Sequence, residues 1–295
     1  MEGEFAEGNF LGLPTPKGDP DVIIASIPYE LTTSYGQGTA KGPSACIEAS
    51  GQVELYDDLL NQELPAGANI LTTKEWNGEG NTLQEQLDSI GRYASKQYDT
   101  GAFPIFLGGE HGMLPGILRG CPEKVTLIQI DAHADLRDEL DGEPYSHACA
   151  ISRSLDEGAL GVYQIGIRAY CKQEAEYISN DERVNTWFAK DILNPSTAQG
   201  SWSDWLDKIS QIKGPVHLTV DIDGLDGTLV PATGTPVPGG LTFWHVVQTI
   251  ETAFSKCDII SADVNEIVPQ NDTPLTQFTA AMIATKIIAA QINRG

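Results

Sequence analysis

Basic side chains are scarce in this sequence. Among its 295 residues, 18 Lys and Arg stand against 41 Asp and Glu, which gives a formal net charge of −23. A surface of this sign repels phosphate backbones and anionic lipid headgroups and attracts cations, so binding to nucleic acid or to a membrane surface is not expected. The acidity is also compatible with solubility or a saline environment, and by itself it defines no substrate.

Cysteine pairs, a secretion signal and long apolar runs are also missing. The five cysteines are widely spaced and form no C-x-x-C pair, which favours a reducing compartment over a disulfide scaffold. Residues 1–5 lack a basic and an apolar region, so we expect no signal peptide. No stretch approaches the roughly 18 apolar residues of a membrane span. These absences predict a cytoplasmic protein.

Strand-like and helix-like segments alternate along the chain, which predicts a parallel sheet with helices on both faces. Apolar runs and amphipathic spacing define the two kinds of segment. The expected strands are 22–27, 103–107, 125–130, 162–167, 184–188, 216–220 and 259–264, and the expected helices are 82–97, 111–118, 202–209, 242–254 and 278–292. Because no linker, repeat or low-complexity tract interrupts this pattern, we predict one α/β domain over residues 1–295.

Three short segments carry acidic residues and histidines directly after apolar runs. They are Gly108–His111, Asp131–Asp135 with the pattern D-x-H-x-D, and Asp221–Asp223 with the pattern D-x-D. Alternate residues of an extended strand point to one face, so this spacing predicts that the side chains of each segment point the same way. Open α/β sheets place their active sites at the carboxyl ends of their strands. The sequence therefore predicts a site at this edge of the sheet.

The side-chain types in these segments favour a metal site. Carboxylate oxygens and imidazole nitrogens without a thiolate are the ligands of manganese-like divalent ions. A shared carboxylate would hold two such ions about 3.5 Å apart, close enough for one hydroxide to bridge them. Aspartate is also a common turn or cap residue after a strand, so any single aspartate here has a purely structural explanation. Three such segments together favour the two-metal hydrolytic site.

Two stretches rich in glycine and proline, residues 33–43 and 224–240, are predicted to be loops around that pocket. Within the second loop, Thr235 is a candidate substrate contact and equally a turn hydroxyl. Asp226 is a candidate for orienting the same loop. His217 lies deeper in its strand than Asp221 and is predicted to be a buried, hydrogen-bonded histidine rather than a ligand.

These segments resemble the ureohydrolase family, which includes arginase and agmatinase. The resemblance rests on motifs in one order along most of the chain: residues 27–43, 131–147, 221–241, and 263–266 with the pattern D-V-x-E. Residues 136–139 and 146–148 are most similar to the agmatinase branch. The resemblance implies a single-domain, three-layer α/β/α fold with a central parallel sheet of about eight strands, assembled as a homotrimer or hexamer.

The resemblance also implies the ligands of two Mn²⁺ ions per chain. The first ion would be bound by His111, Asp131, Asp135 and Asp221, and the second by Asp131, His133, Asp221 and Asp223. Asp131 and Asp221 would therefore bridge the two ions.

Two further residues gain roles from the same resemblance. Glu266 would hold the guanidinium of a substrate through paired hydrogen bonds, and the structural alternative is a strand-end carboxylate in a surface ion pair. His147 would carry protons to the departing amine, and the alternative is a loop histidine without a role.

Five positions depart from the family pattern. One is Ala148, where relatives commonly have Gly, although the agmatinase branch tolerates Ala. Many relatives have Asp and Ser where this chain has Glu110 and Gly112, and Pro and Gly where it has Gly227 and Ala232. All of the expected metal ligands, Glu266 and His147 are retained. The departures therefore concern the shape of the substrate pocket rather than the class of reaction.

The resemblance implies a dimanganese amidinohydrolase of polyamine biosynthesis. It would convert agmatine, a small cationic guanidino compound, to putrescine and urea through attack of a metal-bridging hydroxide on the guanidinium carbon. Guanidinobutyrate, arginine and guanidine are alternative substrates, although residues 136–145 do not resemble the arginase loop that holds an α-amino acid. A one-zinc amide deacetylase is disfavoured by the D-x-D pair, and an inactive family member by the retained ligands.

Overall fold

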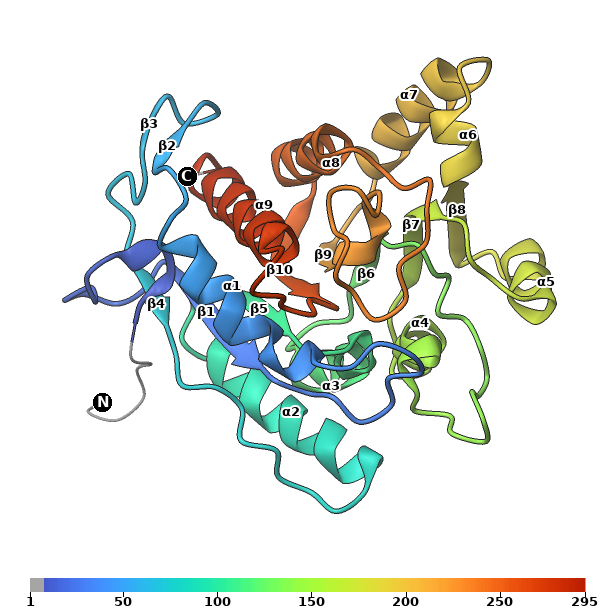
Figure 1. Ribbon diagram of the computed structural model, residues 1–295, viewed down its shortest axis with the longest axis horizontal. Helices are drawn as coiled ribbons and strands as arrows, with labels where there is room; N and C mark the ends of the chain where they lie inside the picture. Colours follow the sequence, from blue (N-terminus) through green and yellow to red (C-terminus); the bar gives the residue numbers. More distant parts are fainter. Residues whose placement is uncertain (1–7, 295) are drawn as a thin grey trace.

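The computed structural model describes residues 8–294, in which a central sheet is covered on both faces by helices (Figure 1). Its strands are β1 (Val22–Ile27), β4 (Ile70–Thr72), β5 (Phe103–Gly108), β6 (Thr126–Ile130), β7 (Gly161–Ile167), β8 (Val184–Phe188), β9 (Pro215–Asp221) and β10 (Asp258–Asn265). Over the described residues these eight strands pair in the order β4-β1-β5-β10-β9-β6-β7-β8, all in parallel. The predicted parallel α/β sheet is confirmed. The expectation for residues 1–5 lies outside the described part.

Helices form a layer on each face of the sheet (Figure 1). One layer contains α1 (Gly42–Ser50), α7 (Ala198–Ile209), α8 (Phe243–Lys256) and α9 (Leu275–Ile292), and the other contains α2 (Leu83–Tyr98), α3 (Leu114–Gly120) and α4 (Ala150–Asp156). The helices α5 (Lys172–Asn180) and α6 (Ala189–Leu193) contact the edge strand β8, and a small hairpin joins β2 (Tyr56–Asp57) to β3 (Gln62–Glu63).

Local sequence explains where these elements begin and what they bury. Helix α2 starts at a capping box, in which Thr82 Oγ1 accepts the N–H of Glu85 and the Glu85 carboxylate accepts the N–H of Thr82. The apolar stripe of this helix buries Leu87 and Ile90 against the sheet. Strands β1, β5 and β6 are buried along their whole length, as expected for a parallel sheet covered on both faces.

Among residues 8–294, helix α9 is long and apolar enough to cross a membrane by length and mean composition, although Thr, Gln and Lys residues interrupt its apolar residues. Of its most apolar window, 67% is buried inside the protein, and the helix packs against α1 and α8. A core helix passes the same composition test as a membrane span because it is apolar on nearly every face.

Candidate metal centre and substrate cavity

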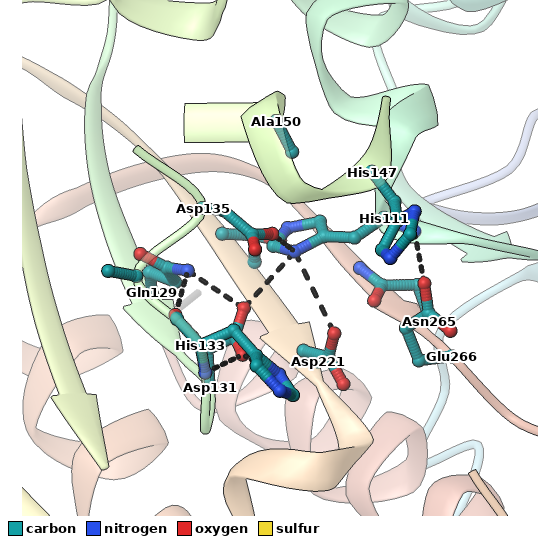
Figure 2. Close-up of polar contacts among 12 residues, drawn as sticks. His111, Gln129, Asp131, His133, Asp135, His147, Ala150, Asp221, Asn265 and Glu266 are labelled. Atoms are coloured by element: carbon teal, nitrogen blue, oxygen red, sulfur yellow. Dashed lines mark hydrogen bonds and ion pairs between the residues drawn. The ribbon is translucent and has the colours of Figure 1, made fainter. Parts of the chain in front are cut away.

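The order of the strands brings the three motifs together. The strands β5, β10, β9 and β6 are neighbours in the sheet, although β5 and β6 come early in the chain and β9 and β10 come late. His111 follows β5 in the 3-10 turn η3 (His111–Met113), Glu266 follows β10, Asp221 ends β9 and Asp131 follows β6. Side chains from all four strand ends therefore meet at one edge of the sheet (Figure 2).

The first group of candidate ligands surrounds the ring of His111 (Figure 2). Its Nδ1 atom lies 3.0 Å from Asp135 and 3.2 Å from Asp131, and 3.8 Å from Asp221. This nitrogen is buried and has no hydrogen-bond partner among residues 8–294. Burial lowers the pKa of His111, but the nearby carboxylates of Asp131 and Asp135 outweigh burial and raise it well above its ordinary value. A cation between ring and carboxylates would satisfy this orphaned nitrogen, so the residues present fit a metal ion.

The second group shares Asp131 with the first. His133 Nδ1 lies 3.1 Å from Asp223 and 3.7 Å from Asp131. Ligand atoms of each group lie within 4.8 Å of one another, the first being His111, Asp131 and Asp135, and the second Asp131, His133 and Asp223. The structure thus assembles two groups that could each hold an ion, with oxygen and nitrogen donors and no thiolate.

The ligands do not converge in the predicted way. We expected D-x-H-x-D and D-x-D to lie along extended strands, and this was wrong: Asp135 has a left-handed backbone with φ of 53°, and Asp223 lies in the 3-10 turn η5 (Ile222–Gly224). Asp131 Oδ1 accepts the N–H of His133 at 2.6 Å, and Asp221 Oδ1 accepts the N–H of Asp223 at 2.9 Å. Tight turns therefore bring the candidate ligands together. Asp131 and Asp221 stabilise these turns and are at the same time candidate metal ligands.

A buried polar stripe behind His111 was missed from the sequence. His111 Nε2 lies 2.9 Å from Thr219 Oγ1, which donates a hydrogen bond to Asp263 at 3.0 Å. His217 is fully buried between Asp263 and Ser261, each at 2.7 Å, as predicted for a core histidine. The signal was readable, because polar residues occupy every second position of apolar strands β9 and β10, and the two strands pair Thr219 with Asp263.

Gln129, which was also missed from the sequence, supports Asp131 through a hydrogen bond. Its amide Nε2 donates to Asp131 Oδ2 at 2.8 Å (Figure 2), and its Oε1 accepts a hydrogen bond from Gln164 at 2.7 Å. Both glutamines are fully buried in β6 and β7. Buried amides of this kind fix the orientation of a ligand carboxylate.

The loop of residues 224–240 is held by Arg168 and Asp226. The Arg168 guanidinium donates to the backbone carbonyls of Asp223, at 2.8 Å, and Val237, at 2.6 Å. Asp226 accepts the N–H groups of Gly239 and Gly240 at 2.9 Å and 3.2 Å. These contacts close the loop beside the D-x-D turn; the sequence suggested the part of Asp226 but not that of Arg168.

A cavity of about 530 Å³ opens over the two groups and is lined by Ser34, His111, His133, Asp135, His147, Asp221, Thr235 and Glu266, among others. Glu266 is 7% exposed, and its Oε1 accepts the N–H of His111 at 2.8 Å. Burial, followed by the charges of Glu110 and Asp223, raises the pKa of Glu266 well above its ordinary value. Burial lowers the pKa of His147. Both side chains predicted to act on the substrate therefore line the same cavity as the ligands.

A parallel sheet between two helical layers, with two groups of histidines and carboxylates at the carboxyl ends of its strands, is typical of metal-dependent hydrolases. Comparisons with known proteins give the family. The arginase family model matches residues 20–290. N(1)-aminopropylagmatine ureohydrolase of Synechocystis sp. is 32% identical over 289 residues, covering 93% of this chain and 90% of that protein. Agmatinase of Bacillus anthracis is 34% identical over 260 residues, covering 86% of each.

Solved structures agree with this assignment. The crystal structure of agmatine ureohydrolase of Thermoplasma volcanium matches with a TM-score of 0.81 at 26% identity, over 98% of this chain and 96% of that one. The chain belongs to the arginase family, and the resemblance seen in the sequence is confirmed. It is an enzyme that hydrolyses carbon–nitrogen bonds.

Proposed function

We propose that this protein hydrolyses agmatine to putrescine and urea with two Mn²⁺ ions. The observation that carries the proposal is the unpaired carboxylate of Glu266 in the cavity. Glu266 is nearly fully buried and forms no ion pair with any residue in the range 8–294, and it shares the cavity with His111, Asp135 and Asp221. A guanidinium supplies both the missing positive charge and paired N–H donors for a carboxylate.

The proposed ligands are His111, Asp131, His133, Asp135, Asp221 and Asp223. Two divalent ions bound by these residues would supply hydroxide at neutral pH by lowering the pKa of water. The chain contributes the geometry: Gln129 and Thr219 hold Asp131 and His111, and the turns at residues 131–133 and 221–223 fix the carboxylates.

Glu266 is proposed to orient the substrate. Its Oε1 accepts the backbone N–H of His111, which holds the carboxylate in place. Each carboxylate oxygen has two lone pairs, so both oxygens can still accept the paired N–H groups of the guanidinium. Holding the planar guanidinium this way would fix its carbon over the ligand groups. Hydrolysis breaks the bond from that carbon to the alkyl nitrogen, and the departing amine takes up a proton. We assign the delivery of this proton to His147.

N(1)-aminopropylagmatine is a second candidate substrate. A relative of that name covers 93% of this chain. A further cavity of about 720 Å³ shares Ser34, Leu140 and Asp141 with the catalytic cavity and also contains Glu143. An extended cationic tail would fit this space, whereas agmatine would leave it to water.

Three finer proposals accompany this function. Manganese follows from the hard oxygen and nitrogen donors. A cytoplasmic location follows from the unpaired cysteines, which are all free in the described chain. Assembly as a homotrimer or hexamer follows from the resemblance to agmatinases.

Urea release from a panel of guanidino compounds tests the proposal. Manganese-loaded protein should release urea from agmatine or N(1)-aminopropylagmatine, with kcat/KM well above that for arginine, guanidinobutyrate and guanidine. Glu266→Gln should retain bound manganese and lose most urea release. Activity on arginine alone would contradict the substrate, and unchanged activity in Glu266→Gln would contradict the role of Glu266.

A further inference from the structure

Glu110, one of the departures from the family pattern, is a buried carboxylate bound to a single short loop segment. Its side chain is fully buried, and it forms no ion pair within the part of the chain that the structure describes. Its Oε2 atom accepts the N–H groups of Leu31 and Thr32 at 3.1 Å and 2.8 Å, and its Oε1 atom accepts the Thr32 hydroxyl at 2.8 Å. Every contact of the carboxylate is therefore a donor from the loop that follows β1.

The second departure, Gly112, makes room for this arrangement. A Cβ atom at residue 112 would lie 3.2 Å from Glu110 Oε1 and 3.3 Å from the backbone nitrogen of His147. A serine at that position would crowd both groups. The longer acid and the smaller neighbour therefore fit together as a pair.

The Thr32 hydroxyl connects Glu110 to His147. It gives its proton to the carboxylate, which leaves its lone pairs free to accept. It accepts the backbone N–H of His147 at 2.9 Å and lies 3.4 Å from His147 Nδ1. Ser146 Oγ lies at the same distance of 3.4 Å from that nitrogen. On the other side of the ring, Nε2 lies 3.5 Å from Ser34 Oγ, a residue that lines the catalytic cavity.

The geometry of these contacts carries the inference. The Thr32 hydroxyl lies between the Glu110 carboxylate and His147, at 2.8 Å from Glu110 Oε1 and 2.9 Å from the backbone nitrogen of His147. The ring of His147 has Nδ1 on the side of Thr32 and Nε2 on the side of Ser34 and the cavity. We propose that Glu110 is a positioning residue that acts through the Thr32 hydroxyl to hold His147 with Nε2 toward the substrate. This role rests on the proposed function of His147 in proton transfer.

Kinetic coupling between Thr32 and His147 tests the proposal in the manganese-loaded protein. Thr32→Val keeps the shape of the side chain and removes the hydroxyl, and Thr32→Ser is the matched control that retains it. Thr32→Val should lower kcat about 10- to 100-fold, as expected for a misplaced catalytic group, with KM and bound metal changed less than about threefold. Thr32→Ser should stay close to the wild-type value. In a His147→Ala background, Thr32→Val should have no further effect.

A purely structural role for Thr32 would give a different pattern. The proposal is overturned if Thr32→Val lowers activity equally in the wild-type and His147→Ala backgrounds, or if it mainly lowers metal content or raises KM. In Glu110→Gln, the side-chain amide would face the N–H donors of the loop, so this variant should reproduce the kcat loss of Thr32→Val. In the His147→Ala background, Glu110→Gln should cause no further loss of kcat.

A second readout does not depend on turnover. The chain has five histidines, so the ring ¹⁵N signals of His147 can be assigned by comparison with His147→Ala. The ring signals of His147 in Thr32→Ser should stay close to those of the wild type, and those in Thr32→Val should shift because the ring loses a neighbouring hydroxyl. Identical His147 ring signals in all three proteins would overturn the proposal. If the wild type releases no urea from any compound, the proposed function fails, and these spectra still decide how Thr32 orients His147.

Discussion

His111 Nε2 lies 2.9 Å from Thr219 Oγ1, and this contact determines which ring nitrogen faces the carboxylates. Because the Thr219 hydroxyl donates to Asp263, it accepts from Nε2–H and leaves the lone pair of His111 on Nδ1. Histidines that bind metals are commonly oriented by such a partner on the other nitrogen. The tautomer that a metal ligand requires is thus built into the core of the sheet.

Thr219→Val should weaken manganese binding about 10- to 100-fold, because the ring loses the acceptor that fixes its tautomer. Titration of metal-free protein with Mn²⁺ measures the change, and Thr219→Ser, which keeps the hydroxyl, is the control. Unchanged manganese affinity in Thr219→Val would show that the buried polar residues of β9 and β10 stabilise the core without contributing to metal binding.

Asp221→Asn should have opposite effects on stability with and without metal. Burial and the charges of Asp223 and Asp131 raise the pKa of Asp221 well above its ordinary value, so the charged carboxylate is disfavoured without a cation. The metal-free variant should gain about 1–3 kcal/mol of unfolding free energy and lose the stabilisation by Mn²⁺ that the wild type shows. Thermal melts in EDTA and in Mn²⁺ measure both changes. A variant less stable than the wild type in EDTA would contradict this account.

Asp226→Asn should destabilise the protein in a pH-dependent manner. Hydrogen bonds from the Thr228 side chain and backbone, and then from Gly239 and Gly240, lower the pKa of Asp226 from 3.8 to about 2. A carboxyl with a lowered folded-state pKa stabilises the fold above its unfolded pKa, and this contribution is lost as the pH falls from about 4 to 2. We expect a loss of about 1 kcal/mol at pH 7, since the side chain is only partly buried. Urea unfolding between pH 7 and pH 3 measures the unfolding free energy of the variant and of the wild type. A difference between the two that stays constant over this pH range would contradict the proposed role of Asp226.

Gly112→Ser should cost about 1–3 kcal/mol of stability, because the added side chain crowds Glu110 and His147. Combining it with Glu110→Asp, which withdraws the carboxylate by one methylene group, should recover part of that loss. Urea unfolding of the two single variants and the double variant gives the coupling between the sites. Simple additivity would mean that the two departures from the family pattern are independent.

Strand positions and chemical character were predictable because they depend on local signals. The apolar runs gave β1 and β8 with the bounds that the structure has, and the acidic motifs were placed correctly at strand ends. The spacing of aspartate carboxylates and histidine imidazoles in the sequence was enough to predict a metal site.

The arrangement of the site was less predictable because it depends on sheet order and turns. Nothing in the sequence indicates that β10 lies between β5 and β9, which places Glu266 beside His111. The D-x-H-x-D spacing does not indicate the left-handed backbone that Asp135 adopts. Short elements such as β4 and α4 were missed because they are too brief to show periodicity.

The most direct test of the central claim is urea formation from agmatine as Mn²⁺ is added stepwise to metal-free protein. The account predicts that activity rises to a plateau at two ions per chain. A plateau at one ion, or two ions bound without urea formation from agmatine or its aminopropyl derivative, would contradict it.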